Sequence, residues 1–155
     1  MNRIAVFPGS FDPFTNGHKN IVERALPLFD TIIIAIGVNT IKHSLFTVDE
    51  RIAQIKEVFT HNSAIQVVEY KGLTIDFCKS VGAQCIIRGV RNGTDFEYEN
   101  AIAQVNREIS AGIETIMIPC DVSLSAISST IVRDLIKYGR DVSDYIPFNL
   151  VTKND

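Results

Sequence analysis

The sequence predicts an α/β protein built on a doubly wound, five-stranded parallel sheet with helices on both faces. Short apolar, β-prone runs alternate along the chain with segments of helical periodicity. The run at residues 31–38 is apolar throughout after its first residue, which is typical of a strand buried on both faces of a sheet. The 155 residues, 46% of them hydrophobic, suit one compact domain and leave no room for a second.

The N-terminal half contains two strand–helix units. The strand at residues 4–7 is apolar and ends at turn formers, of which Pro8 is the first. A helix follows from Gly17, because apolar residues then recur at helical spacing. After the strand at residues 31–38, the segment 47–50 (TVDE) places a hydroxyl three residues ahead of a glutamate. This capping box predicts the start of the second helix.

The C-terminal half repeats the alternation. Three further apolar runs predict strands at residues 65–70, 85–88 and 115–119, and helical periodicity predicts helices at about 74–81, 96–110 and 128–138. A short turn or helix is expected near residues 142–146. Within the fourth helix one apolar stripe comprises Tyr98, Ala101, Ile102, Val105 and Ile109. In such a Rossmann-like sheet, ligands bind beyond the carboxyl ends of the strands, near the point where strand order reverses.

Composition excludes several classes of function. A formal net charge of -3 argues against broad binding to nucleic acid or to an anionic membrane. The N-terminal apolar run is too short for a signal sequence and no run approaches membrane-spanning length, so we expect a soluble, cytoplasmic protein. Cys78, Cys85 and Cys120 are odd in number and lack C-x-x-C spacing, which favours buried, reduced thiols over disulfides or a zinc site.

Groups suited to an anion follow several predicted strands. The loop after the first strand lacks the dinucleotide and P-loop motifs, yet His18 lies in the first turn of the next helix, where backbone N–H groups favour an anion. Lys42 follows the second strand, Arg88 and Arg91 follow the fourth, and three hydroxyls at residues 128–130 follow the fifth. A lone histidine or N-cap serine would be unremarkable. Four such features at one sheet edge predict a polyanion site.

These segments resemble the bacterial phosphopantetheine adenylyltransferases, a family of the nucleotidyltransferase superfamily that carries the T/H-x-G-H motif. The resemblance runs nearly end to end, and its most specific parts are residues 8–18 (PGSFDPFTNGH), 88–91 (RGVR), 95–99 (DFEYE) and 127–130 (ISST). The motif alone indicates the superfamily, whereas RGVR joined to DFEYE narrows it to this family. The resemblance implies one nucleotidyltransferase domain over residues 1–155.

The resemblance also implies an activity. Members transfer AMP from ATP to 4'-phosphopantetheine, giving dephospho-coenzyme A and pyrophosphate in the penultimate step of coenzyme A biosynthesis. They use Mg²⁺ and usually form homohexamers, with dephospho-coenzyme A and coenzyme A as product or feedback ligands. No protein side chain is assigned to the metal.

Roles for individual residues follow from the same resemblance. His18 would stabilise the transition state at the α-phosphate, with Ser10 and Lys42 beside it. The acceptor would meet Ser10, Lys42, Thr74 and Arg88. The ATP site would comprise Ser10, Phe11, His18, Gly89, Val90, Arg91, Glu99, Leu124, Ser125, Ala126, Ile127, Ser128, Ser129 and Thr130. Leu124 and Ala126 depart from the aromatic residues that many members have there, so altered packing around the nucleotide is expected.

Transfer of AMP to a phosphate acceptor requires few catalytic groups. A phosphate acceptor is already a nucleophile at neutral pH, so direct in-line transfer needs alignment and charge neutralisation and no covalent enzyme intermediate. One alternative is a related transferase that acts on nicotinate mononucleotide or glycerol phosphate, which the segment 88–99 disfavours. Another is a non-catalytic module that binds ATP or coenzyme A, which could dispense with His18 and Lys42. Sequence pattern alone does not separate an exposed apolar interface from core, so the oligomeric state rests on resemblance.

Overall fold

The computed structural model describes residues 2–38, 41, 43–110 and 112–150. Within them, five parallel strands form one sheet in the order β3-β2-β1-β4-β5. The strands are β1 (Ile4–Gly9), β2 (Thr31–Gly37), β3 (Ile65–Tyr70), β4 (Cys85–Val90) and β5 (Glu114–Pro119). The chain builds outward from β1 in one direction and then, from β4, in the other. The predicted fold class is confirmed, and the reversal point lies between β1 and β4.

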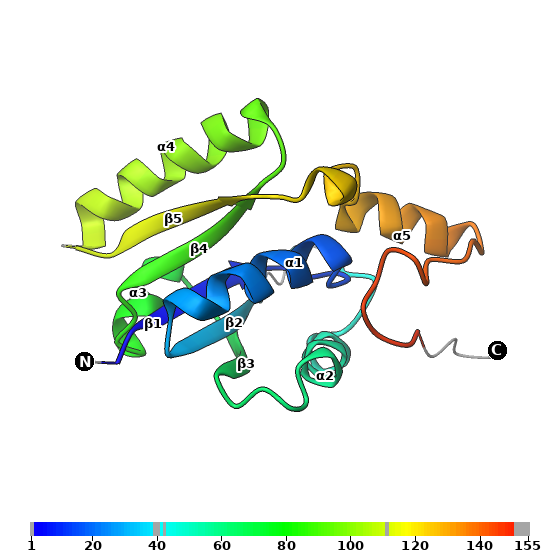
Figure 1. The fold of residues 1–155 in the computed structure, drawn as a ribbon, viewed down its shortest axis with the longest axis horizontal. Helices are drawn as coiled ribbons and strands as arrows, with labels where there is room; N and C mark the ends of the chain where they lie inside the picture. Colours follow the sequence, from blue (N-terminus) through cyan, green and yellow to red (C-terminus); the bar gives the residue numbers. More distant parts are fainter. Residues whose placement is uncertain (1, 39–40, 42, 111, 151–155) are drawn as a thin grey trace.

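Helices cover both faces of this sheet (Figure 1). α1 (Asn16–Ala25), α2 (Val48–Val58) and α5 (Ser129–Lys137) pack on one face, and α3 (Thr74–Ser80) and α4 (Gly93–Ser110) lie on the other. Two short 3-10 helices, η1 (Leu26–Leu28) and η2 (Val122–Leu124), follow α1 and β5. The segment predicted near 142–146 is a turn.

The strand β2 shows why the sheet needs helices on both sides. Ile32, Ile34 and Ile36 pack toward α1 and α2, whereas Ile33 and Ala35 pack toward α3. All five side chains are at most 5% exposed. Burying one such isoleucine contributes about 2 kcal/mol. The interpretation of this run as a strand buried on both faces is therefore confirmed.

The strand β1 runs two residues beyond its predicted end. Pro8 and Gly9 continue its pairing with Ala35 and Ile36 of β2. A proline is tolerated there because β4 pairs with β1 only near Ala5 and Val6, so the absent N–H of Pro8 removes no hydrogen bond to β4. The turn formers correctly predicted that the strand ends in this region, but they placed its end two residues too early.

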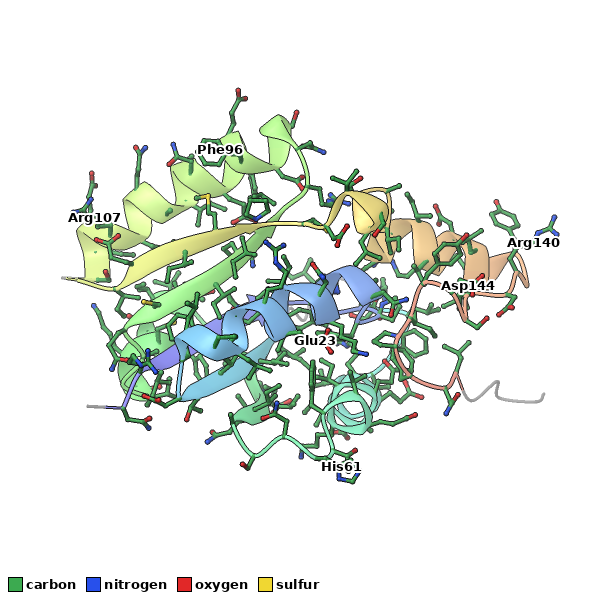
Figure 2. The ribbon with its side chains drawn as sticks, in the orientation of Figure 1. Glu23, His61, Phe96, Arg107, Arg140 and Asp144 are labelled. Atoms are coloured by element: carbon green, nitrogen blue, oxygen red, sulfur yellow. The ribbon has the colours of Figure 1, made fainter. Side chains whose placement is uncertain are left out.

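Helix α4 differs from expectation at its start and on its surface. It begins at Gly93, three residues before the predicted start. Its predicted apolar stripe is not buried in this chain, and Glu99 and Ser110 are the buried residues of the described helix. The members of the stripe are exposed: Tyr98 at 67%, Ile102 at 38%, Val105 at 56% and Ile109 at 49%. Phe96 and Arg107, labelled in Figure 2, mark this helix on the outside of the molecule.

All three cysteines are free thiols, as predicted, but the predicted burial holds for only one of them. Cys78 is buried, but Cys85 and Cys120 are only partly buried. Burial raises the pKa of the Cys78 thiol to about 11. Among the helices that the structure describes, none has the length and apolar character needed to cross a membrane.

Candidate functional site

Two cavities adjoin where strand order reverses. The first, about 290 Å³, lies on the α1 side and is lined by His18 and Ile21. The second, about 210 Å³, lies on the other face and is lined by Thr74 of α3 and by α4. Residues of both β1 and β4 line both cavities, namely Pro8, Gly9 and Arg88, and Glu99 of α4 does so as well. Both cavities therefore lie at the strand ends where a ligand was predicted.

His18 is held by the residue that caps its own helix. The Thr15 amide donates to His18 Nδ1 at 3.0 Å, the Thr15 hydroxyl lies 3.1 Å from the same nitrogen, and the His18 amide donates to that hydroxyl at 3.4 Å. Because a main-chain N–H can only donate, Nδ1 is an acceptor and the ring proton lies on Nε2. Burial, together with Arg88 and Arg91, lowers the pKa of His18 to about 4. The imidazole is a neutral hydrogen-bond donor at pH 7.

Aromatic rings fix the orientation of this imidazole. Phe11 contacts it edge-on with ring centroids 5.1 Å apart, and Phe14 packs at 5.3 Å. Phe7 lies slightly further away, at 6.2 Å. Phe11 and Phe14 are nearly fully buried. This apolar packing desolvates the ring and thereby contributes to its lowered pKa.

Gly9 makes room for Phe11. A Cβ at Gly9 would lie 2.9 Å from the tip of the Phe11 ring, closer than real side chains approach. Phe11 itself has φ 47°, in the left-handed region that bulky residues rarely adopt. A glycine at a strand end often lets a ligand approach the backbone closely. In the structure the group that approaches Gly9 is the folded-back ring of Phe11.

The two arginines of the fourth strand end are each paired with a carboxylate of α4. Arg88 donates from Nε and Nη2 to Glu99 at 2.8 and 2.5 Å, and from Nη1 to the Pro8 carbonyl at 2.7 Å. Arg91 donates from Nε to Asp95 at 2.9 Å. This hydrogen bond lowers the pKa of Asp95. The pairs orient the guanidinium groups and neutralise them, so the cavity is less cationic than the sequence suggested.

The first cavity brings most of the predicted ATP-site residues together. Its lining includes Ser10, Phe11, His18, Arg88, Gly89, Arg91, Glu99, Ile127, Ser128 and Ser129. The second cavity brings Thr74 together with Arg88, and the Thr74 hydroxyl lies 2.7 Å from the Tyr70 hydroxyl. Lys42, predicted to act in catalysis and acceptor binding, lies outside the residues that the structure describes.

Other predicted residues do not line either cavity, namely Val90, Leu124, Ser125, Ala126 and Thr130. Successive strand residues face opposite sides, so Val90 points away from the α1 side that Gly89 faces. The three hydroxyls at the start of α5 are already engaged. Ser128 caps the helix, Ser129 donates to the Pro13 carbonyl, and Thr130 accepts from Arg133.

Three polar or thiol side chains of the first cavity, Thr15, Asp95 and Cys120, received no individual role from the sequence. Thr15 carried a signal, since an N-cap residue lies three positions before His18. Asp95 also carried one, because it follows Arg91 by the four residues of a helical ion pair. Cys120 follows β5 with no comparable pattern, and only the fold brings it into the lining.

A metal would find few free ligands here. Among the described residues, no group of three or more His, Cys, Asp or Glu side chains could hold an ion. The two carboxylates of the first cavity, Asp95 and Glu99, are bonded to arginines. A divalent cation in this cavity would therefore take its ligands mainly from a bound anion and water.

Comparisons with known proteins agree with this arrangement. The cytidylyltransferase-like family model matches residues 6–135. The chain is 50% identical over 148 residues to the phosphopantetheine adenylyltransferase of Porphyromonas gingivalis, covering 96% of each chain. It is 53% identical over 145 residues to that of Flavobacterium psychrophilum, covering 94% of this chain and 95% of the relative. A bifunctional NMN adenylyltransferase/ADP ribose pyrophosphatase from Francisella tularensis shares the fold, with TM-score 0.74 and 17% identity over 97% of this chain and 46% of that one.

Proposed function

This chain belongs to the phosphopantetheine adenylyltransferases within the cytidylyltransferase-like family, and on that premise we propose that it transfers AMP from ATP to 4'-phosphopantetheine. The products are dephospho-coenzyme A and pyrophosphate, in the penultimate step of coenzyme A biosynthesis. The observation that carries this proposal is the identity of about half over nearly the whole chain to relatives of that name.

The two adjoining cavities suit two substrates. ATP would occupy the first cavity, with its α-phosphate beside His18, and the acceptor would occupy the second, beside Thr74. Arg88 lines both cavities and is the group best placed to contact both phosphates. Bringing two anions together at such a boundary is the main task of this reaction.

The transfer itself is a direct displacement. An acceptor phosphate oxygen forms a bond to the α-phosphorus, the bond to the bridging oxygen of the β-phosphate breaks, and pyrophosphate leaves. Nε2–H of His18 donates to the α-phosphate oxygen on which charge builds up, and Thr15 keeps that proton on Nε2. Lys42 and Ser10 stay assigned to this step by resemblance alone.

Mg²⁺ is the proposed cofactor. The carboxylates of the cavity are paired with arginines, which fits an ion held by the triphosphate and water more than by side chains. Bound there, the ion would neutralise part of the phosphate charge.

We further propose a homohexamer that works in the cytoplasm and binds coenzyme A as a feedback ligand. The exposed apolar stripe of α4 supports assembly, because a contiguous apolar face on a helix is usually covered by a partner. The pattern does not set the number of subunits, and the hexamer is proposed from the family resemblance alone.

A pyrophosphate-release assay tests the reaction. Mg-ATP would be offered with 4'-phosphopantetheine, pantetheine, nicotinate mononucleotide or glycerol phosphate in separate reactions. Turnover should occur with 4'-phosphopantetheine and be absent with pantetheine, which lacks the nucleophile. Turnover with nicotinate mononucleotide or glycerol phosphate, and none with 4'-phosphopantetheine, would contradict this proposal. It would indicate a related transferase that acts on that acceptor.

His18→Ala tests the proposed role of the imidazole. Losing one donor to the transition state should lower kcat by about a hundredfold or more while ATP affinity changes little. His61→Ala, at the exposed histidine labelled in Figure 2, is the matched control and should behave as wild type. An equal loss of affinity and turnover in His18→Ala would make His18 a binding residue.

A further inference from the structure

The loop between β1 and α1 is held by side chains that reach its carbonyl groups from other elements. Arg51 of α2 donates to the Ser10 carbonyl, and Arg133 of α5 donates to the Asp12 carbonyl. We propose that Arg51, assisted by Asp12, is a positioning residue that turns the amide N–H of Phe11 toward the first cavity to bind a phosphate of ATP. This role deepens the proposed function and rests on it for its ligand.

Arg51 is unusual for a charged residue. It is 4% exposed, and Nη1 donates to the Ser10 carbonyl at 2.6 Å while Nε donates to the Thr47 carbonyl at 3.3 Å. None of its hydrogen bonds to described residues ends on a carboxylate. A buried charge normally has a partner of opposite charge, because desolvation is costly. The hydrogen-bond acceptors of Arg51 are instead neutral carbonyl oxygens. One of them belongs to Ser10, which lines the first cavity.

The geometry of one peptide unit links Arg51 to the cavity. In a trans peptide, the carbonyl of Ser10 and the N–H of Phe11 point in opposite directions. Arg51 draws the carbonyl toward α2 and does not itself line the cavity, whereas Ser10 and Phe11 do. The Phe11 N–H therefore points away from α2, and no described residue accepts a hydrogen bond from it.

This orientation requires support because Phe11 is strained. Its φ of 47° is unfavourable for a bulky residue and persists only where neighbours hold the backbone. Arg51 holds the carbonyl that precedes Phe11, and Arg133 holds the Asp12 carbonyl at 2.7 Å. The backbone of Phe11 is thus fixed on both sides.

Asp12 completes a reciprocal connection between two loops. Its carboxylate, 5% exposed, accepts from the amides of Leu45 at 2.8 Å and Phe46 at 2.9 Å. The β1–α1 loop thus holds the end of the β2–α2 connection through Asp12, and α2 holds the β1–α1 loop through Arg51. A shift of either loop would disturb the other, so the Phe11 amide is preorganised before ATP arrives.

The test uses Arg51→Met, which keeps the aliphatic length and removes the donors, and Arg51→Lys, which keeps the charge and can reach one acceptor. Lys56→Met, at an exposed position on the same helix, is the matched control. Mg-ATP affinity would be measured by calorimetry without any acceptor, and kcat and KM by pyrophosphate release with 4'-phosphopantetheine. Melting temperatures identify folded variants.

For Arg51→Met we expect ATP affinity to fall about tenfold or more, the equivalent of one lost charge-assisted hydrogen bond. KM for ATP should rise and kcat should fall, Arg51→Lys should be intermediate, and Lys56→Met should match wild type. A folded Arg51→Met with wild-type affinity and kcat, and only a lower melting temperature, would overturn the proposal. If Arg51→Met does not fold, wild-type affinity in Arg51→Lys would overturn it equally. If the wild-type protein shows no turnover, the proposed reaction is contradicted. The calorimetric comparison of Mg-ATP affinity between wild type and variants would remain valid, because it uses no acceptor.

Discussion

At the scale of single residues, Thr15 and His18 combine structural and chemical roles. The capping box that begins α1 also decides which nitrogen of the imidazole carries the proton. The sequence predicted that His18 belongs to the site, because it follows a strand at the start of a helix. Its neutrality was not predictable, since it depends on three phenylalanines and two arginines that only the fold brings together.

The lowered pKa of His18 has a consequence for stability. Between pH 6.5 and about 4, the unfolded chain binds a proton at this residue that the folded chain does not. The free energy of unfolding should therefore fall as the pH drops through this window, by up to about 3 kcal/mol in total. Urea unfolding of wild type and His18→Gln at pH 7 and pH 5 measures the difference. A wild type that loses no more stability than the variant would contradict this account.

The close approach of Phe11 to Gly9 predicts the effect of one methyl group. Gly9→Ala should push the Phe11 ring away, destabilise the fold by about 1–3 kcal/mol and weaken ATP binding. Gly93→Ala is the control, because no atom within 4 Å would meet its Cβ. Chemical denaturation and calorimetry measure both effects. Unchanged stability in Gly9→Ala would show that the loop relaxes without cost.

At the scale of elements, local signals were predictable and tertiary ones were not. The capping box at residues 47–50 forms as expected, with Glu50 N donating to the Thr47 hydroxyl at 3.2 Å and Thr47 N donating to the Glu50 carboxylate at 2.8 Å. Its partners are three residues apart, so sequence alone reveals it. The end of β1 depends instead on how far β2 and β4 pair with it, and those strands are distant in sequence.

The stripe on α4 predicts an assembly contact. Ile109→Glu should weaken self-association, because a charge would then be buried against an apolar partner surface. Ile131→Glu on α5 is a matched control, since its side chain is 51% exposed against 49% for Ile109. Sedimentation velocity reports the subunit number of each variant. A hexamer that persists in Ile109→Glu would place the interface elsewhere.

At the scale of the whole molecule, the alternation of elements predicted the parallel sheet but not its strand order. The rule that ligands bind at carboxyl ends was enough to collect His18, Arg88, Arg91, Ser128 and Ser129 in advance, whereas the other assigned cavity residues came from the family resemblance. The rule could not identify Glu99 as the carboxylate that neutralises Arg88. Nor could it reveal Arg51, whose contact with Ser10 spans 41 positions in the chain. Such pairings are set by the packing of α2 and α4, which no periodicity encodes.

Ligand binding should stabilise the entire fold. Mg-ATP at a hundred times its dissociation constant would add about 2.7 kcal/mol to the unfolding free energy. For a chain of this size that corresponds to a rise in melting temperature of about 5–10 °C. Differential scanning calorimetry with Mg-ATP, with ATP plus a chelator, and with adenosine separates the contributions. An equal rise with adenosine would show that the phosphates contribute nothing.

The aromatic packing around His18 also gives the protein a built-in spectroscopic reporter. The imidazole packs edge-on against Phe11 and at a tilt against Phe14, so ring currents displace its proton resonances from their usual NMR positions. Any movement of the β1–α1 loop on nucleotide binding would change those displacements. Three histidines in the chain keep the imidazole region of the spectrum simple. Occupancy of the first cavity could thus be followed in solution without attaching a label.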